Sequence, residues 1–497
     1  MRPALDGHAG IPQETRLLFR GLAQLEGIEI EGLIQSGNQV LAKGLPVSAG
    51  KLRGNLSIDK QINRLSRVVV SLQKPGKRDV FDRAAAMLQM MLAPIRLTVS
   101  NVLGIKQTLG AFDPTHFRDF VWRSMFSRTL PLSDFDTVTQ ARFRIARAPY
   151  GAMHACALAT RKFGHALYPK LDTRGIDLMI AETPYPGTVS APTRLVIRYH
   201  DAFPVLMPHT IIDKSYHQAA HYHALRKNVS SGAHFACVSE ATRRDLLSIF
   251  PKAKAVTIPN MLSHHYFAET SSPVRVPEII TTRLNNGIKV RPPAHKLPIN
   301  ANAGGAGFEY LLMVSTIEPR KNHTTLLAAW EQLRSERYAD LKLVIVGSLG
   351  WDHKLITRKF RPWLERGDIF LLEDVPASEL RLLYRHARAT VCPSLAEGFD
   401  FSGVEAMCCG GAVVASDIPV HREIFDTAAE FFSPYSASDV ARAIVRVIDP
   451  ANLARRDELV AVGAEVSARY QPERILPQWR AFLDELFAAD LVTGTEA

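Results

Sequence analysis

From Tyr310 onward, short apolar runs alternate with segments of helical character, and this alternation constrains the fold more than any other feature of the chain. Each run is bounded by turn residues and is too short for an ordinary helix, which is typical of buried strands. Strands that alternate with helices form parallel sheets covered by helices on both faces. We therefore predict a doubly wound α/β domain, with strands at 310–316, 341–348, 369–374, 389–394 and 412–416.

The first half of the chain shows the same pattern less regularly. Apolar runs at 177–182, 193–201, 234–239 and 255–260 predict buried parallel strands. From about 267 to 307 the pattern breaks into Pro, Asn, Gly and Ala, which indicates a linker. Two such domains form a cleft, and ligands bind beyond the carboxyl ends of the strands. The predicted organisation is a first domain at 1–266, a linker at 267–307, a second domain at 308–470, and a C-terminal helix and tail at 471–497 that packs back toward the first domain.

The N-terminus departs from a strand–loop–helix pattern. Gly7 and Gly10 stand in a loop that precedes a helix, but no apolar strand comes before this loop. A strand there needs about five apolar residues ahead of Arg2. Either the first strand is absent, or the natural chain starts upstream of this sequence; we favour the second alternative.

The composition excludes several classes of protein. Of 497 residues, 46% are apolar and the mean hydropathy is −0.03, which fits a globular protein of two or three domains. No run reaches the roughly 18 apolar residues that a membrane span needs, and no signal peptide is recognisable. The five cysteines show no metal-type spacing, and adjacent Cys408 and Cys409 suit buried thiols. We expect a cytoplasmic protein.

The net charge of +11 is concentrated between Lys51 and Arg78, where eight Lys or Arg accompany one acid, Asp59. Two interpretations stay open: a solvated basic helix and loop, or a patch that faces anionic lipid headgroups ahead of the apolar stretch at 84–95. Nucleic acid is not an expected partner, because no recognition motif or basic–aromatic interleaving accompanies the charge.

The segment STIEPRKN follows the first strand of the second domain and places Arg320 and Lys321 at the start of the next helix. Free backbone N–H groups and the helix dipole favour anions there. Arg grips a diphosphate with two N–H groups, while Lys acts as a point charge. A motif of this kind standing alone more often marks two solvated basic residues, so its weight depends on what accompanies it.

The segment PSLAEGFDFSGVEAM follows the fourth strand of this domain. Gly398 permits a close turn, and the backbone amides of 399–401 can approach a phosphate or a sugar. Glu397 stands at the exit of the strand and Glu405 on the helix. Eight residues at about 100° each would put the two acids on different helix faces. They are therefore not a paired acid and base, and each serves a separate ligand group.

At their observed separation, STIEPRKN and EGFDFSGVEAM…GGAVVASDIPVHREI resemble the retaining GT-B glycosyltransferases of the E-x7-E, or group 1, family. The resemblance covers most of 308–435 and is thinner in VIRYHDAFP, CVSEATRRDL and TIPN of the first half. It is strongest to the bacterial mannosyltransferase-like members that build surface polysaccharides. The implied fold is GT-B: two doubly wound Rossmann-like domains that face each other across a cleft.

The resemblance implies a role for each matching residue. Lys321 and Arg320 bind the donor's diphosphate, Glu397 holds hydroxyls of the donor sugar, and Glu405 accepts from the ribose. His200 faces the sugar from the first domain. Val375 matches the segment whose backbone lies along the base of the nucleotide, and Gly10 matches the loop that closes on the phosphates. The implied catalytic set is His200, Glu397 and Lys321, and the donor-binding set is Gly10, Arg320, Lys321, Val375, Glu397, Gly398, Phe399, Asp400, Phe401 and Glu405.

Three features depart from the family pattern or imitate another one. Ser315 and Thr316 stand where many relatives have a Gly-Arg pair, which puts one phosphate cation in doubt. Asp400 replaces the glycine common after EGF, and can add a contact to the sugar or the acceptor. The DFD run at 134–136 imitates the metal motif of a different glycosyltransferase fold, but its place in a first-half loop argues against a metal site. No metal or other cofactor is expected, so cations and the helix dipole must stabilise the leaving group.

The resemblance implies that a sugar passes, with retention at the anomeric carbon, from a nucleoside diphosphate sugar to a saccharide or lipid-linked saccharide acceptor in bacterial surface glycan synthesis. GDP-mannose is the expected donor, and UDP-glucose or another sugar nucleotide is the alternative.

The expected location of the protein is the cytoplasm, including the inner face of the plasma membrane. Two other classes are weighed: a phosphorylase or epimerase of the same fold, and a non-catalytic binder of glycans or nucleotides. The ribose role of Glu405 argues against a phosphorylase, and its co-occurrence with Lys321 and Glu397 argues against a binder.

Overall fold

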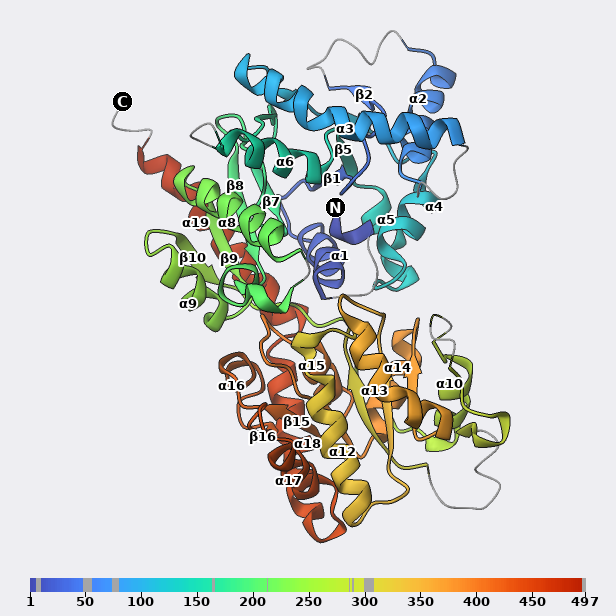
Figure 1. The fold of residues 1–497 in the computed structure, drawn as a ribbon. Helices are drawn as coiled ribbons and strands as arrows, with labels where there is room; N and C mark the ends of the chain where they lie inside the picture. Colours follow the sequence, from blue (N-terminus) through green and yellow to red (C-terminus); the bar gives the residue numbers. More distant parts are fainter. Residues whose placement is uncertain are drawn as a thin grey trace. The chain divides into compact units, whose positions relative to one another are not determined.

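The computed structural model of the chain describes residues 1–5, 10–47, 56–73, 80–162, 166–211, 213–285, 287, 290–298 and 308–493. These form two compact units (Figure 1). The N-terminal unit comprises Met1–Pro208, Asp213–Val238 and Arg243–Thr257, and the C-terminal unit comprises His209–Ile212, Ser239–Thr242 and Ile258–Ala497. Both units are α/β, which confirms the predicted fold class at that level.

The C-terminal unit is built on a buried parallel sheet. Its strands β11 (Tyr310–Val314), β12 (Lys342–Val346), β13 (Ile369–Leu372), β14 (Ala389–Cys392), β15 (Val413–Ser416) and β16 (Ala429–Phe432) lie in the order β13-β12-β11-β14-β15-β16. A strand such as β13, Ile-Phe-Leu-Leu, is buried at every position. Strands covered on both faces carry continuous apolar runs, which is why all of them except β16 were predicted from the sequence.

The strand order of this sheet reverses at β11. The chain steps from β11 to β13 on one side, then returns to pair β14 with the other edge of β11. Leu311 and Leu312 of β11 lie opposite Ala389 and Thr390 of β14 in parallel register. In sheets of this order, ligands bind beyond the carboxyl ends of the strands at the point of reversal. The loops that leave β11 and β14 are therefore where a site is expected.

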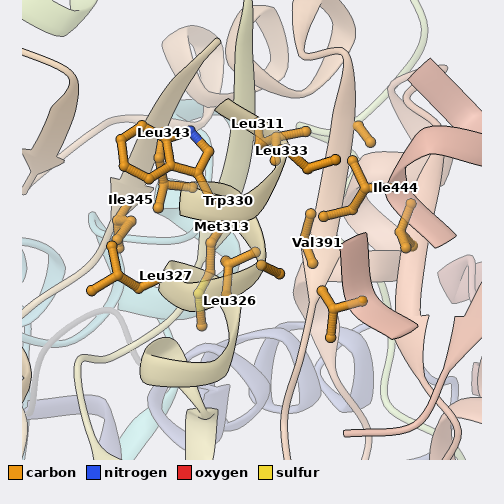
Figure 2. Packing of buried hydrophobic residues seen from close by; sticks show 14 of the residues in the cluster. Leu311, Met313, Leu326, Leu327, Trp330, Leu333, Leu343, Ile345, Val391 and Ile444 are labelled. Carbon is orange, nitrogen blue, oxygen red and sulfur yellow. The ribbon is translucent and has the colours of Figure 1, made fainter. Parts of the chain in front are cut away.

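Helices cover this sheet and close its core. They are α12 (His323–Glu336), α13 (His353–Arg366), α14 (Ala377–His386), α15 (Phe401–Cys408), α16 (Pro419–Phe425), α17 (Ala437–Ile448) and α18 (Leu453–Ala468), and α19 (Pro472–Thr493) follows them in the chain. Fully buried Trp330 of α12 donates its Nε1–H to the carbonyl of Leu341 (3.0 Å) and packs edge-on against Trp363. Figure 2 shows its ring beside Leu343 within the hydrophobic cluster. The expected packing of the last helix toward the first domain stays a prediction.

Part of the predicted linker has regular structure. Helix α10 (Val276–Thr282) packs on α14, and the residues after it reach the edge of the sheet. There the Asn285 N–H donates to the carbonyl of Leu371 (2.8 Å). This segment therefore lies in the C-terminal unit, whereas residues 299–307 lie outside the described residues.

The N-terminal unit contains the strands that were predicted for the first half. They are β7 (Leu178–Ala181), β8 (Arg194–Tyr199), β9 (His234–Cys237) and β10 (Lys254–Thr257), parallel and in the order β10-β9-β8-β7. Helices α6 (Tyr150–Arg161), α7 (Phe203–Leu206), α8 (Lys214–Ser230) and α9 (Glu240–Ile249) accompany them. Ile197, Tyr199, Phe235 and Cys237 lie in the buried core of this sheet.

A second sheet in this unit was not predicted. In it, β1 (Glu31–Gln35) runs parallel to β5 (Arg142–Ala146), while β4 (Gly110–Phe112) and β2 (Leu45–Pro46) continue it in antiparallel pairing. The short strands β3 (Gln107–Thr108) and β6 (Leu171–Asp172) pair separately. The remaining helices are α1 (Gly10–Leu22), α2 (Ile58–Ser71), α3 (Val80–Val102), α4 (Arg118–Val121) and α5 (Phe135–Thr139). Of the basic stretch 51–78, residues 51–55 and 74–78 lie outside the described residues.

We expect Trp330→Ala to lower the free energy of unfolding of the C-terminal unit by about 3–5 kcal/mol, because it opens a cavity in a fully packed core. Leu355→Ala on α13, where the side chain is 65% exposed, is the control and should change the value by no more than about 0.5 kcal/mol. Urea unfolding followed by far-UV circular dichroism measures both. Equal midpoints for the two variants would contradict this account of the core.

Candidate active site

The loops that leave β11 and β14 bring three of the predicted site residues into contact. Arg320 and Lys321 lie in the short 3₁₀ turn Pro319–Lys321 after β11, and Glu397 lies after β14. The Leu395 N–H donates to the carbonyl of Arg320 (2.9 Å), which joins the two loops through their backbones. Because β11 and β14 are neighbours in the sheet, residues 76 and 77 positions apart in sequence become direct partners.

Glu397 is the centre of this charge cluster. One carboxylate oxygen accepts from the Lys321 ammonium, and the other accepts from Arg320 Nη1 at 2.8 Å. Arg320 also donates to the carbonyl of Ala396 (2.6 Å) and, through Nη2, to Glu318 (2.9 Å). The Glu397 side chain is 7% exposed, against 13% for Arg320 and 16% for Lys321. The predicted sugar ligand and the predicted phosphate ligands therefore hold one another in this structure.

The cluster lowers the pKa of the Glu397 carboxyl, whereas the pKa of the Glu318 carboxyl is raised. Burial acts to raise the pKa of Glu397, but the charges of Arg320 and Lys321 outweigh it, so the net shift is downward. Burial raises the pKa of Glu318, and the same two cations offset that only in part. Lys321 has three N–H donors, so its ammonium can hold Glu397 and a phosphate oxygen together.

Asn322, the last residue of STIEPRKN, holds the strand ends in place. Its backbone adopts the left-handed conformation (φ 59°) and its buried side chain donates to the carbonyls of Pro393 (3.0 Å) and Pro434 (2.8 Å). These carbonyls follow β14 and β16, so one amide joins three strand ends. Sequence reasoning missed this role, although asparagine is among the few residues that tolerate this conformation.

Ser315, at the position where the family pattern places a glycine, contacts a buried histidine. Its hydroxyl lies 3.3 Å from Nε2 of His323, the first residue of α12. Burial, helped by the Lys321 charge, lowers the pKa of His323 to about 3, so the ring is neutral near neutral pH. His323 therefore adds no positive charge beside Lys321. The doubt over a missing phosphate cation stays open.

Asp400 has a local role that the sequence did not reveal. One oxygen of its carboxylate accepts from the Ser402 N–H (3.1 Å) and hydroxyl (2.6 Å), which caps helix α15. The other lies 3.1 Å from Nε2 of His421 on α16. The carboxylate is thus engaged by its own chain on both oxygens, and a contact of Asp400 with the sugar or the acceptor stays a prediction.

His421 continues this chain of hydrogen bonds into the sheet. Its Nδ1 lies 3.0 Å from both the carbonyl and the hydroxyl of Ser416, and that hydroxyl donates onward to the carbonyl of Ser394 (2.6 Å). Because the serine hydrogen is already used, Nδ1 must donate; Nε2 must donate as well, because it faces a carboxylate. Both ring nitrogens of the buried His421 therefore face acceptors, Nδ1 the Ser416 carbonyl and Nε2 the Asp400 carboxylate.

The remaining predicted residues of the C-terminal unit differ in how they are held. Glu405 on α15 is 4% exposed and accepts from the hydroxyl of Tyr384 (3.0 Å). Phe399 is buried and packs edge-on against Phe401 and Tyr470, both at 5.2 Å between ring centroids. Val375 lies half-buried between β13 and α14, at the same edge of the sheet as Glu397. Gly398 lies between Glu397 and Phe399, in the loop that leaves β14.

In the N-terminal unit, His200 follows β8 and pairs with a residue that sequence reasoning missed. Its Nε2 lies 3.2 Å from Glu182, which follows the neighbouring strand β7, and both side chains are nearly buried. The only signal for Glu182 was its place at a strand exit. Gly10 is the first residue of α1, while the loop residues 6–9 before it lie outside the described residues.

The acids of the DFD run serve local ion pairs. Asp134 pairs with Arg20 (3.1 Å), and Asp136 pairs with Arg118. Each carboxylate therefore has a cationic partner of its own chain.

We expect Asp400→Asn to destabilise the C-terminal unit by ~3 kcal/mol at neutral pH, because it removes the buried anion that Ser402 and His421 contact. Burial acts to raise the pKa of Asp400, but the hydrogen bond and charge of His421 outweigh it and the folded-state pKa is lowered. A depressed carboxyl pKa stabilises the fold above its ordinary value of about 3.9, and this stabilisation is lost as pH falls below it.

The difference in stability between wild type and Asp400→Asn should therefore narrow below about pH 4. Urea unfolding across this range measures it. Asp417→Asn, which breaks an exposed pair with Arg422, is the matched control and should cost at most ~1 kcal/mol. A cost for Asp400→Asn as small as that of the control would refute the buried pair.

Known proteins are similar to this chain over the part that holds the charge cluster. Residues 301–458 match the family model described as glycosyl transferases group 1. The serotype-specific mannosyltransferase WbdA of Escherichia coli is 37% identical over 157 residues, which cover 31% of this chain and 19% of the relative. The O-antigen chain mannosyltransferase B of Escherichia coli is 32% identical over 170 residues, covering 34% of this chain and 45% of the relative.

The matches are partial in length. The chain aligns with about a fifth of WbdA and with less than half of mannosyltransferase B. Among solved structures, sucrose-phosphate synthase from Thermosynechococcus elongatus is 18% identical with a TM-score of 0.48, covering 70% of this chain and 84% of the other. The matched segment includes Arg320, Lys321, Glu397 and Glu405, the residues on which the sequence resemblance was based. Residues 301–458 therefore match the glycosyl transferases group 1 family and are mannosyltransferase-like in sequence.

Proposed function

We propose that this protein transfers mannose from GDP-mannose to a growing lipid-linked or polysaccharide acceptor in bacterial surface glycan synthesis, with retention at the anomeric carbon. The observation that carries the proposal is the cluster of Lys321, Arg320 and Glu397 at the point where the strand order reverses. Two cations held beside the buried carboxylates of Glu397 and Glu318 form a site for a diphosphate next to a group that can accept from sugar hydroxyls. The names of the relatives support mannose and an O-antigen type of acceptor.

The charges of the cluster suit a leaving group rather than a covalent intermediate. As the bond from the sugar to the diphosphate breaks, negative charge grows on the departing oxygens, where Lys321 and Arg320 stabilise it. Both oxygens of Glu397 are engaged by cations, which makes its carboxylate a weak nucleophile and a weak base. A phosphate oxygen of the donor then takes the proton of the acceptor hydroxyl, which attacks the face that the diphosphate leaves. No metal is required in this scheme.

A UDP-sugar is the alternative donor, and binding of GDP or UDP ligands to the protein distinguishes the two donors. We expect GDP and GDP-mannose to raise the melting temperature, because a ligand at 100 times its Kd stabilises the folded state by about 2.7 kcal/mol. UDP and UDP-glucose at equal concentration should give a smaller shift, and EDTA should leave the shifts unchanged. Differential scanning fluorimetry measures all four ligands. A larger shift with UDP would transfer the proposal to a UDP-sugar, and no shift with any of them would contradict a nucleotide-sugar enzyme.

Lys321→Ala should lower kcat by about 10²- to 10³-fold, because it removes a cation that acts on the charge developing in the transition state. Lys354→Ala, an exposed lysine on α13, is the control and should leave kcat unchanged. Release of GDP from GDP-mannose in the presence of acceptor measures the rate, and circular dichroism checks that both variants fold. Unchanged turnover in Lys321→Ala would refute the role of this residue, and turnover absent in the wild type would favour a non-catalytic binder.

A further inference from the structure

Helix α3 carries a long apolar stripe on its exposed side. Met87 is 68% exposed, Met91 65%, Ile95 60%, Val99 53% and Val102 69%. Successive members are four, four, four and three residues apart, so they lie along one side of the helix. Leu88 and Leu103 widen the same stripe and are also more than half exposed. Large contiguous apolar surfaces of this kind mark interaction sites.

The other side of α3 is fixed in the fold, so the stripe is not a core face that lacks its partner. Ala93 and Leu97 are buried in the core of the N-terminal unit, and α3 packs on α6. The Thr98 hydroxyl lies 3.2 Å from the sulfur of Cys156 on α6. Figure 1 shows α3 as a long, nearly straight helix across this unit. One side thus anchors the helix while the other presents the stripe.

The charge around the stripe is basic. From Ala84 to Phe112 the chain has no Asp or Glu, while Arg96 and Lys106 are both exposed. Over the longer stretch from Lys51 to Phe112, eleven Lys or Arg accompany three Asp. An apolar face in a stretch of chain with this excess of Lys and Arg complements a bilayer surface with anionic headgroups. In a symmetric pair of this chain the same surface would meet itself and bring like charges together, which disfavours a second copy as the occupant.

We propose that α3 is the membrane-binding element of this protein: it lies in the plane of an anionic bilayer surface, with the stripe from Met87 to Leu103 among the acyl chains. Among the described residues, none of the helices is long and apolar enough to cross a bilayer. The proposal deepens the proposed function, on which it rests for its purpose, because it holds the enzyme where a lipid-linked acceptor resides.

Flotation with vesicles tests the proposal on the full chain. Vesicles of phosphatidylcholine with phosphatidylglycerol should carry the wild type upward, and pure phosphatidylcholine should carry much less. The variant Met91→Gln/Ile95→Gln should bind at least tenfold more weakly, since two exposed apolar side chains leave the acyl region. Val274→Gln/Leu355→Gln replaces two exposed apolar residues of the C-terminal unit and should bind as the wild type does.

Three outcomes of these experiments would overturn the inference. If the wild type does not float with anionic vesicles at low or high salt, α3 is not a membrane element. If Met91→Gln/Ile95→Gln floats like the wild type, the stripe is not the contact. If sedimentation velocity shows a wild-type dimer that this variant loses, the stripe binds a second copy.

A separate assay distinguishes failure of the proposed sugar transfer from failure of the membrane role of α3. Release of GDP from GDP-mannose with a water-soluble saccharide acceptor, in the absence of vesicles, should be equal in the wild type and in Met91→Gln/Ile95→Gln. Vesicle binding without any such turnover would contradict the sugar transfer but leave the membrane role of α3 in place. Turnover without vesicle binding would contradict the membrane role of α3 but leave the sugar transfer in place.

Discussion

Burial of the Glu397 carboxylate is the constraint on which the site in the C-terminal unit depends. An ionised carboxylate removed from water costs several kcal/mol unless cations and hydrogen bonds compensate it. Arg320 and Lys321 supply that compensation, and they come from the loop that follows the neighbouring strand β11. They can reach Glu397 because the strand order places β14 beside β11. The charge pairing therefore depends on the topology, and a different strand order would leave Glu397 buried without partners.

Such a cluster contributes little net stability to the fold. Buried ion pairs roughly balance the cost of desolvation against the attraction of their charges, so apolar residues of the same volume would stabilise the fold at least as well. A pre-oriented pair of cations, by contrast, needs no reorganisation when negative charge arrives. Asn322 supports this orientation by holding the carbonyls after β14 and β16 on either side of the loop. Asn322 thereby fixes the loop that carries both cations to the ends of two other strands of the sheet.

The parts of this structure that could be predicted from sequence are those with local signals. The strands of the C-terminal sheet are continuous apolar runs because both of their faces are covered. Lys321 and Glu397 stand at strand exits within specific motifs. The sheet of β1, β5, β4 and β2 escaped prediction because β2 and β4 are very short, and because β1 and β5 carry charged residues, as in Arg142–Ala146. The partner of His200 escaped it too, because Glu182 becomes a neighbour only through the pairing of β7 with β8. The apolar run in α3 was visible in the sequence, but its exposure depends on which side the rest of the unit covers.

Asp400 shows why a motif can be recognised while one of its residues is misread. The family pattern has glycine here, and the backbone adopts a left-handed conformation (φ 69°) that glycine reaches without strain. The left-handed conformation costs aspartate roughly 1 kcal/mol, although aspartate tolerates this conformation better than most residues. Its carboxylate offsets that cost by capping α15 through Ser402 and by pairing with His421.

The same pair places α15 relative to α16, where an added Cβ at Gly403 would lie 2.2 Å from the Phe425 ring. The ring of His421 in turn stacks on Phe425, at 4.8 Å between centroids. The two helices can approach this closely because one position has no side chain and the other has an anion that holds the facing histidine. The departure from the family pattern thus exchanges the backbone freedom of glycine for a side-chain contact between helices. Because residues 397–401 lead directly into α15, that contact also sets the backbone on which Glu397 stands.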